Sequence, residues 1–175
     1  MKQFLKCSVL ALMALLTMSV FTACGGDDDD TPGGSSEFIG VHRMDVEFNG
    51  NFEGLKVTTM FEGVKADGRP ADLYENGKVL EGIKDKVWAS FEVRSFSIQT
   101  EDNCGAIVAS VLILTDDGLP ITSDVSVTMV GYINNKRVAT KVFTLPAGKR
   151  VLSVVLTTDE GGKGGGVVDD EEIKY

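Results

Sequence analysis

The sequence is poor in the side chains that most enzymes use for chemistry. Its 175 residues include one histidine, three cysteines and 7% aromatic residues. A zinc site needs three or four His, Cys or carboxylate ligands, and a serine hydrolase needs a G-x-S-x-G elbow with a histidine base. The lone His42 completes neither set. We therefore expect no catalytic residue, no metal and no cofactor.

Acidic side chains outnumber basic ones, 26 to 17, but most of the excess lies near the ends of the chain. Residues 24–37 hold five acids and no base, and residues 159–175 hold six acids and two bases. The middle, residues 38–158, is close to neutral with 13 bases and 15 acids. Because it carries no basic stripe, we expect no nucleic-acid partner.

The N-terminus has the pattern of an export signal. Two lysines precede residues 7–21, CSVLALMALLTMSVF, which are uncharged and fall short of the roughly 20 residues of a membrane span. The sequence FTACG at 21–25 then resembles a lipobox, although Phe21 replaces the usual leucine. The resemblance implies cleavage before Cys24 and acylation of that cysteine, so that two or more acyl chains anchor the protein to a membrane. The alternative is an ordinary secretory signal with a chance cysteine.

The segment GGDDDD that follows Cys24 resembles the acidic tract of surface-exported lipoproteins from gut Bacteroidota. This resemblance implies lipid anchoring in the outer membrane with the protein on the cell surface. A periplasm-facing location is the alternative. A solvated spacer also explains the four aspartates, because like charges in a row repel and extend the chain.

These segments predict a single folded domain. We expect a signal peptide at 1–23, an acidic Gly-rich tether at 24–37, one domain at 38–158, and a flexible acidic tail at 159–175. The tail contains GGKGGG, which is costly to order. Cys104 is then the only free thiol, and we expect it to be a small buried residue.

Period-2 alternation predicts that the domain is built of strands. His42, Met44, Val46 and Phe48 share an apolar face, so we expect His42 to be a packed residue rather than a ligand. Alternating segments cover residues 41–48, 55–62, 87–99, 125–129, 138–145 and 152–156. Residues 106–115 are apolar on both faces and are expected at a sheet centre. Residues 79–88 are expected to be a loop with one helical turn.

Turn residues and a phase change mark where strands end or bend. Asn49-Gly50 predicts a hairpin between the first two strands, and Asn76-Gly77 and Asn134-Asn135 predict two more. A phase slip predicts a β-bulge near Ser95.

The pattern predicts an all-β sandwich of about seven or eight mostly antiparallel strands. The layout resembles the immunoglobulin-like or fibronectin type III-like modules of Bacteroidota envelope proteins. A prealbumin-like sandwich or a small barrel agrees with the same pattern, because strand order is not readable from one sequence.

The candidate ligand-binding residues are Trp88, Tyr132 and Tyr74, since exposed aromatic rings stack on sugars and loop amides bind sugar hydroxyls. Each is also a common core or strand-edge residue. Asp116, Asp117 and Asp124 form no EF-hand pattern, and we interpret them as turn residues rather than as a calcium loop.

We expect a non-catalytic binding or accessory module of the cell envelope, for glycan capture or adhesion at the cell surface. The first alternative is a structural or assembly component, such as a fimbria-like subunit or a partner of an outer-membrane complex. Such a component needs an unpaired sheet edge, which an edge strand or the VVDDEEIKY tail could supply. A carboxylate-dependent glycan-active enzyme is the third reading.

Overall fold

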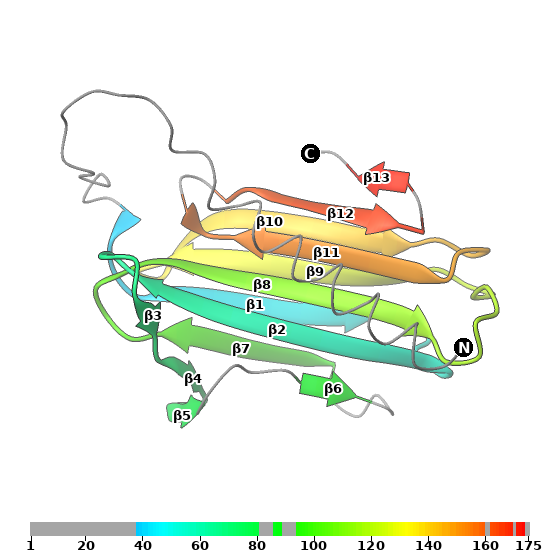
Figure 1. Cartoon of the computed structure of the whole chain (residues 1–175), viewed down its shortest axis with the longest axis horizontal. Coiled ribbons are helices and arrows are strands. Elements are labelled where there is room, and N and C mark those ends of the chain that lie inside the picture. The colour runs from blue at the N-terminus through cyan, green and yellow to red at the C-terminus, as the bar shows by residue number, and fades with distance from the viewer. Residues whose placement is uncertain (1–37, 81–85, 89–93, 160–161, 170, 174–175) are drawn as a thin grey trace. The chain divides into compact units, whose positions relative to one another are not determined.

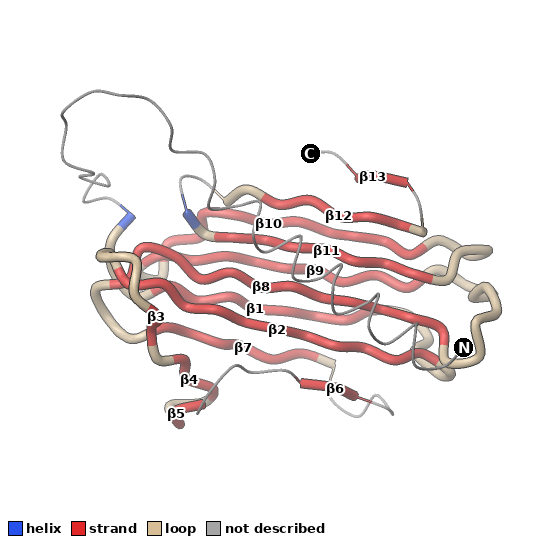
Figure 2. Tube along the Cα trace, in the orientation of Figure 1, coloured by secondary structure: helices blue, strands red, loops and turns tan. Residues whose placement is uncertain are grey.

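The computed structural model describes residues 38–80, 86–88, 94–159, 162–169 and 171–173. These residues form two antiparallel β-sheets that pack face to face (Figures 1 and 2). The all-β sandwich predicted from the sequence is thus confirmed. No helix within the described ranges is long and apolar enough to cross a membrane.

One sheet has six strands, drawn from both halves of the domain. Its order is β10 (Lys136–Leu145), β9 (Val125–Ile133), β1 (His42–Asn49), β7 (Ser95–Thr100), β4 (Leu73–Glu75) and β5 (Lys78–Leu80). The expected hairpins at Asn76-Gly77 and Asn134-Asn135 are confirmed, because they join β4 to β5 and β9 to β10. All four turn residues have positive φ, as two-residue hairpin turns of type I′ require.

The other sheet has seven strands. Its order is β13 (Glu171–Ile173), β12 (Gly164–Val168), β11 (Val151–Thr157), β8 (Cys104–Thr115), β2 (Leu55–Lys65) and β3 (Pro70–Ala71), and β6 (Lys86–Trp88) also pairs with β2. β8 lies between β2 and β11, which confirms the sheet-centre position expected for residues 106–115. Of the 13 strands in the described ranges, eight have five or more residues, in line with the predicted seven or eight.

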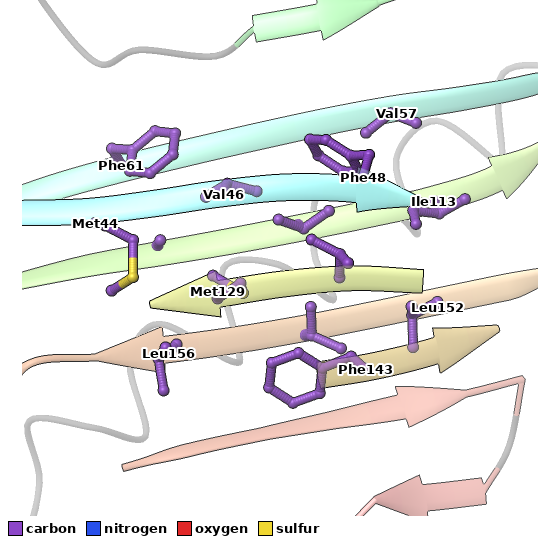
Figure 3. Close-up of a cluster of buried hydrophobic side chains, with 14 of the residues drawn as sticks. Met44, Val46, Phe48, Val57, Phe61, Ile113, Met129, Phe143, Leu152 and Leu156 are labelled. Carbon is purple, nitrogen blue, oxygen red and sulfur yellow. The ribbon is translucent and has the colours of Figure 1, made fainter. Parts of the chain in front are cut away.

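The inner faces of the two sheets share one apolar core. Alternate residues of each long strand point into it, among them Met44, Phe48, Val57, Ile113 and Leu156 (Figure 3). Burying one such side chain contributes about 1.5–3 kcal/mol. The alternation read from the sequence therefore identified the core face correctly.

The hairpin predicted at Asn49-Gly50 is wrong. β1 pairs with β7 and β9 in one sheet, whereas β2 pairs with β8 in the other. The connection between them carries Phe52, which is 3% exposed and contacts the ring of Phe48 edge to face, with 5.7 Å between ring centroids. Because this ring packs in the core, the chain crosses from one sheet to the other. A two-residue turn would instead have paired β1 with β2 in the same sheet.

The prediction of a flexible tail at 159–175 is also wrong. The folded part does not end near Thr158, as the sequence pattern predicted. Residues 164–168 form β12, which pairs with β11 and places Val168 in the core. The glycines of β12 allow its backbone to lie close to β11. A Cβ on Gly166 would lie 2.5 Å from Cγ1 of Val154 and 2.8 Å from the Ser153 carbonyl oxygen.

The prediction of a loop with one helical turn at 79–88 is wrong for the part of this segment that the structure describes. Residues 78–80 and 86–88 are strands β5 and β6, and residues 81–85 lie outside the described residues. The β-bulge expected near Ser95 is wrong, because residues 87–99 are not one strand: β6 pairs with β2 in the seven-stranded sheet, whereas β7 pairs with β1 and β4 in the six-stranded sheet. The change of phase marks a change of sheet, and residues 89–93 lie outside the described residues.

Packing of β12 predicts that Gly166→Ala destabilises the domain. The added methyl group must displace Val154 or the β11 backbone, and overpacking of this kind costs about 1–3 kcal/mol. Urea unfolding of the soluble mature chain measures the change. Val167→Ala, on the opposite face of the same strand, is the matched control and should cost less. Equal stability of the Gly166→Ala variant and the parent would show that β12 does not pack against β11 as closely as described.

Candidate functional site

The outer face of the six-stranded sheet carries a row of mainly polar and aromatic side chains. The strand register aligns a single residue from each of the six strands. Across β10, β9, β1, β7, β4 and β5 they are Arg137, Tyr132, Arg43, Gln99, Tyr74 and Val79. We call this set the tyrosine row. On β9, β1 and β7 it points outward because the next residue of each strand, Ile133, Met44 and Thr100, is buried.

Two of the three aromatic candidates thus lie on the same face. Tyr132 and Tyr74 are both half-buried, and three strand spacings of about 4.8 Å place their Cα atoms about 14 Å apart. Trp88 is not brought near them. Its backbone belongs to β6, opposite Val57 in the other sheet, and its side chain lies outside the description.

Arg43 is fixed in the middle of the row. Its guanidinium carbon lies 3.9 Å from the centroid of the Tyr132 ring, which is a cation–π contact. Its Nε lies 3.1 Å from Oδ1 of Asp45, and its Nη1 donates to Oδ1 of Asn135 at 3.2 Å. These contacts leave a planar, charged donor group oriented beside an aromatic ring. Sequence reasoning missed Arg43 and Gln99, although both occupy outward positions of alternating strands.

His42 is a structural residue, as predicted. It is fully buried, and its Nε2 lies 2.9 Å from the carbonyl oxygen of Phe38 and 3.0 Å from that of Cys104. Since carbonyl oxygens only accept, Nε2 carries the proton, and Nδ1 accepts from the Thr158 hydroxyl at 2.6 Å. The same hydroxyl oxygen accepts the N–H of Ile107 at 3.0 Å. The ring therefore joins β1, β8 and the end of β11.

Burial lowers the pKa of His42 below its usual value, because the charged form is poorly solvated. The hydrogen bonds to Phe38 and Cys104 and the charge of Asp159 act in the opposite direction and offset only part of this effect. The neutral ring is thus the form that the fold contains.

Cys104 is a buried free cysteine, which confirms the sequence prediction. Burial is the main cause that raises the pKa of its thiol. A raised thiol pKa is the reverse of what a nucleophilic cysteine requires.

The acids considered for calcium have other partners. Asp117 Oδ1 accepts the Leu119 N–H and Asp124 Oδ1 accepts the Ala147 N–H, both at 2.8 Å, while Asp116 pairs with Lys56. Within the described ranges, no cluster of three or more His, Cys, Asp or Glu residues is placed to hold a metal ion.

Two described carboxyl groups have a shifted pKa, and in both the pKa is lowered. Hydrogen bonds to Arg69 lower the pKa of Asp67, and a hydrogen bond to Lys65 lowers that of Glu101. The Lys65 Nζ lies 2.9 Å from Oε1 of Glu101. Both acids are thereby held ionised at neutral pH.

The fold and this outer face define the chain as a two-sheet, all-β domain with one polar, aromatic-bearing surface. No protein family and no curated protein matches the sequence. The structure is similar to a DUF4425 family protein from Bacteroides ovatus, with a TM-score of 0.58 and 21% identity over 69% of this chain and 96% of that one.

Two further solved structures from the Bacteroidales have the same fold. A domain of unknown function, DUF4425, from Bacteroides vulgatus has a TM-score of 0.58 and 18% identity, over 70% of this chain and 98% of that one. A protein from Parabacteroides distasonis, solved in its calcium-bound form, has a TM-score of 0.53 and 17% identity, over 71% and 92%. At these identities the likeness concerns the fold alone.

Because His42 is buried and neutral, we expect the free energy of unfolding to depend on pH. Below about pH 6.5 the unfolded chain takes up a proton that the folded ring resists, so the free energy of unfolding falls as pH falls toward the lower pKa of the folded protein. Urea unfolding at several pH values between 7.5 and 5 measures this. Because His42 is the only histidine, the His42→Gln variant is less stable but should lack this component. An identical pH profile in both proteins would refute the assignment.

Proposed function

We propose that the chain is a non-catalytic binding module of the cell envelope and that the tyrosine row is its ligand surface. The observation that carries the proposal is the alignment of Tyr74 and Tyr132 on one outward face, with Arg43 and Gln99 between them. Aromatic rings flanking fixed hydrogen-bond donors are suited to a ligand that has both apolar and hydroxyl-bearing surfaces.

A glycan is the ligand class that fits best. Sugar rings present an apolar face to aromatic side chains and hydroxyl groups to amides and guanidinium groups. The tyrosines are about 14 Å apart along a row that crosses the strands. This spacing favours an extended chain of several sugars over a single small molecule, which would instead need an enclosing pocket.

The two acids with a resolved pKa shift do not suit the role of a glycosidase's general acid. A glycosidase needs one carboxylic acid whose pKa is raised so that it can protonate the leaving group. Among the described carboxyl groups with a resolved shift, Asp67 and Glu101, the pKa is lowered. The proposal assigns binding alone to the tyrosine row.

Attachment to the outer membrane through Cys24, with the domain on the cell surface, is part of the proposal. It rests on the FTACG and GGDDDD segments of the sequence. The similar structures come from Bacteroides and Parabacteroides species, which agrees with the bacterial group that these segments indicate.

The alternative of an assembly component has one observation in its favour. β10, a strand of ten residues, lies at an edge of the six-stranded sheet as described, where another chain could add a strand. The VVDDEEIKY tail does not favour it, because Val167 and Val168 already pair with β11.

Replacing both tyrosines should weaken glycan binding. We expect Tyr74→Ala/Tyr132→Ala to lose at least about tenfold in affinity, since stacking on each ring contributes about 1 kcal/mol or more. Glycan arrays followed by calorimetry with the soluble mature chain, with and without calcium, measure this. Val142→Ala is the control, because Val142 is 55% exposed and lies on the same face outside the row.

Tyr132→Phe keeps the ring and its contact with Arg43, so it should retain most of the affinity. Binding that survives in the double alanine variant would exclude the tyrosine row as the ligand surface. Absence of binding to every glycan tested would favour the assembly component instead.

Cell-surface display is tested by protease treatment of intact cells that express the full-length protein. We expect the released peptides, identified by mass spectrometry, to include those of the domain, while a periplasmic control protein stays intact. Protection of the domain until the outer membrane is broken would contradict display on the surface and support the periplasm-facing alternative.

A further inference from the structure

Positive charge is concentrated in one stretch of the chain. Residues 125–158 hold five basic and no acidic side chains, whereas residues 38–124 hold eight bases and 15 acids. Three of the five bases lie on β10, and they are Lys136, Arg137 and Lys141. Because β10 pairs with β9, this charge adjoins the Tyr132 end of the tyrosine row.

A β-bulge places Arg137 on the outward face. The pairing of β10 with β9 shifts between Arg137 and Ala139, so Val138 is an extra residue in the strand. Strict alternation back from the outward Thr140 would turn residue 137 inward. The extra residue reverses this, and Arg137 lies opposite the outward Tyr132. Bulges that redirect a side chain in this way are frequent beside functional sites.

Arg137 differs from the other guanidinium group of the row because it has no counter-charge. Arg43, on the far side of Tyr132, pairs with Asp45, whose Oδ1 also accepts the Ser97 hydroxyl at 2.6 Å. Arg137 is exposed and makes no ion pair with any residue that the structure describes. None of the outward positions of β9 and β10 is acidic. The positive charge at this end of the row is therefore available to a ligand.

A guanidinium group next to an aromatic ring is suited to an acidic sugar. The carboxylate of a uronic acid and a sulfate ester both accept two parallel hydrogen bonds from an arginine. The sugar ring that carries the acidic group would then contact the Tyr132 ring, of which Arg43 covers only one face. Several like charges on one strand also attract an anionic ligand before contact.

We propose that the ligand of the tyrosine row is an acidic glycan whose carboxylate or sulfate group binds Arg137 beside Tyr132. This inference rests on the proposed glycan-binding function and adds the charge of the ligand and the end of the row that recognises it. The five acids at 24–37 precede this end of the domain and oppose an acidic ligand by charge. The whole mature chain is therefore the protein to test.

Calorimetry with pairs of oligosaccharides that differ only in charge tests the proposal. The pairs are oligogalacturonate and alginate oligosaccharides, each with its carboxyl-reduced form, and sulfated galactan oligosaccharides with their desulfated form. We expect at least one acidic form to bind about fivefold more tightly than its neutral form, as one exposed ion pair allows. The pair that responds shows whether the group is a carboxylate or a sulfate. No preference for the acidic form in any pair overturns the proposal.

Substitution of Arg137 tests where the acidic group binds. Arg137→Gln should remove the about fivefold preference, because it weakens binding of the acidic form and leaves that of the neutral form unchanged. Arg150→Gln is the matched control. It removes the same charge from the same acid-free stretch, but Arg150 is exposed in the connection after β10, at the far end of that strand from Tyr132. Equal losses in the two variants would indicate general attraction to a basic surface and overturn the assignment to Arg137.

Failure of this inference and failure of the proposed function give different results. Binding that is restricted to neutral glycans and weakened in Tyr74→Ala/Tyr132→Ala keeps the tyrosine row as the ligand surface but overturns the acidic ligand. Binding of an acidic form that is unaffected in the double alanine variant overturns both. Equal affinity for a single-stranded DNA of similar charge would overturn recognition of a sugar. Each variant is first checked for parental urea unfolding, so that misfolding is not read as loss of binding.

Discussion

The register of β1 against β7 and β9 is the constraint on which the rest of the molecule depends. Side chains alternate along a strand, so a slip of one residue would turn Met44, Val46 and Phe48 outward and push Arg43 and Asp45 into the core. That slip would cost several buried side chains and leave charges unsolvated. The burial of one face therefore fixes the position of every residue on the other. The tyrosine row exists because the core sets this register.

The sequence predicted those features that depend on local alternation and turn chemistry. Met44, Val46 and Phe48 were placed on the core face, and Asn134-Asn135 was identified as a hairpin. Prediction from the sequence failed where long-range packing determines the structure. Asn49-Gly50 has the composition of a tight turn, but Phe52 beyond it is buried and carries the chain to the other sheet. GGKGGG has the composition of a flexible segment, but the lack of side chains lets Gly164 and Gly166 approach β11.

Two residues of the candidate site could be selected from the sequence, but the geometry of the site could not be predicted. Tyr74 and Tyr132 were selected as aromatics beside turns, but they are 58 positions apart in the sequence, and only the strand order β9-β1-β7-β4 shows that they share a row. Arg43 and Gln99 could have been recognised as outward residues of their strands. That they lie between the two tyrosines depends on non-local pairing, which one sequence does not encode in any local pattern.

The tyrosine row lies at the end of the sandwich where the tether enters, and this affects what it can bind. Asn134 accepts the N–H of Val41 and donates to the carbonyl oxygen of Ile39, while Gly40 and Cys104 exchange two backbone hydrogen bonds. These contacts fix the entry point beside Tyr132. In the proposed lipid-anchored arrangement, the acidic segment 24–37 is then what separates the row from the membrane, and 14 residues reach at most about 50 Å when extended. Shortening this segment should impair capture of large glycans before that of short ones.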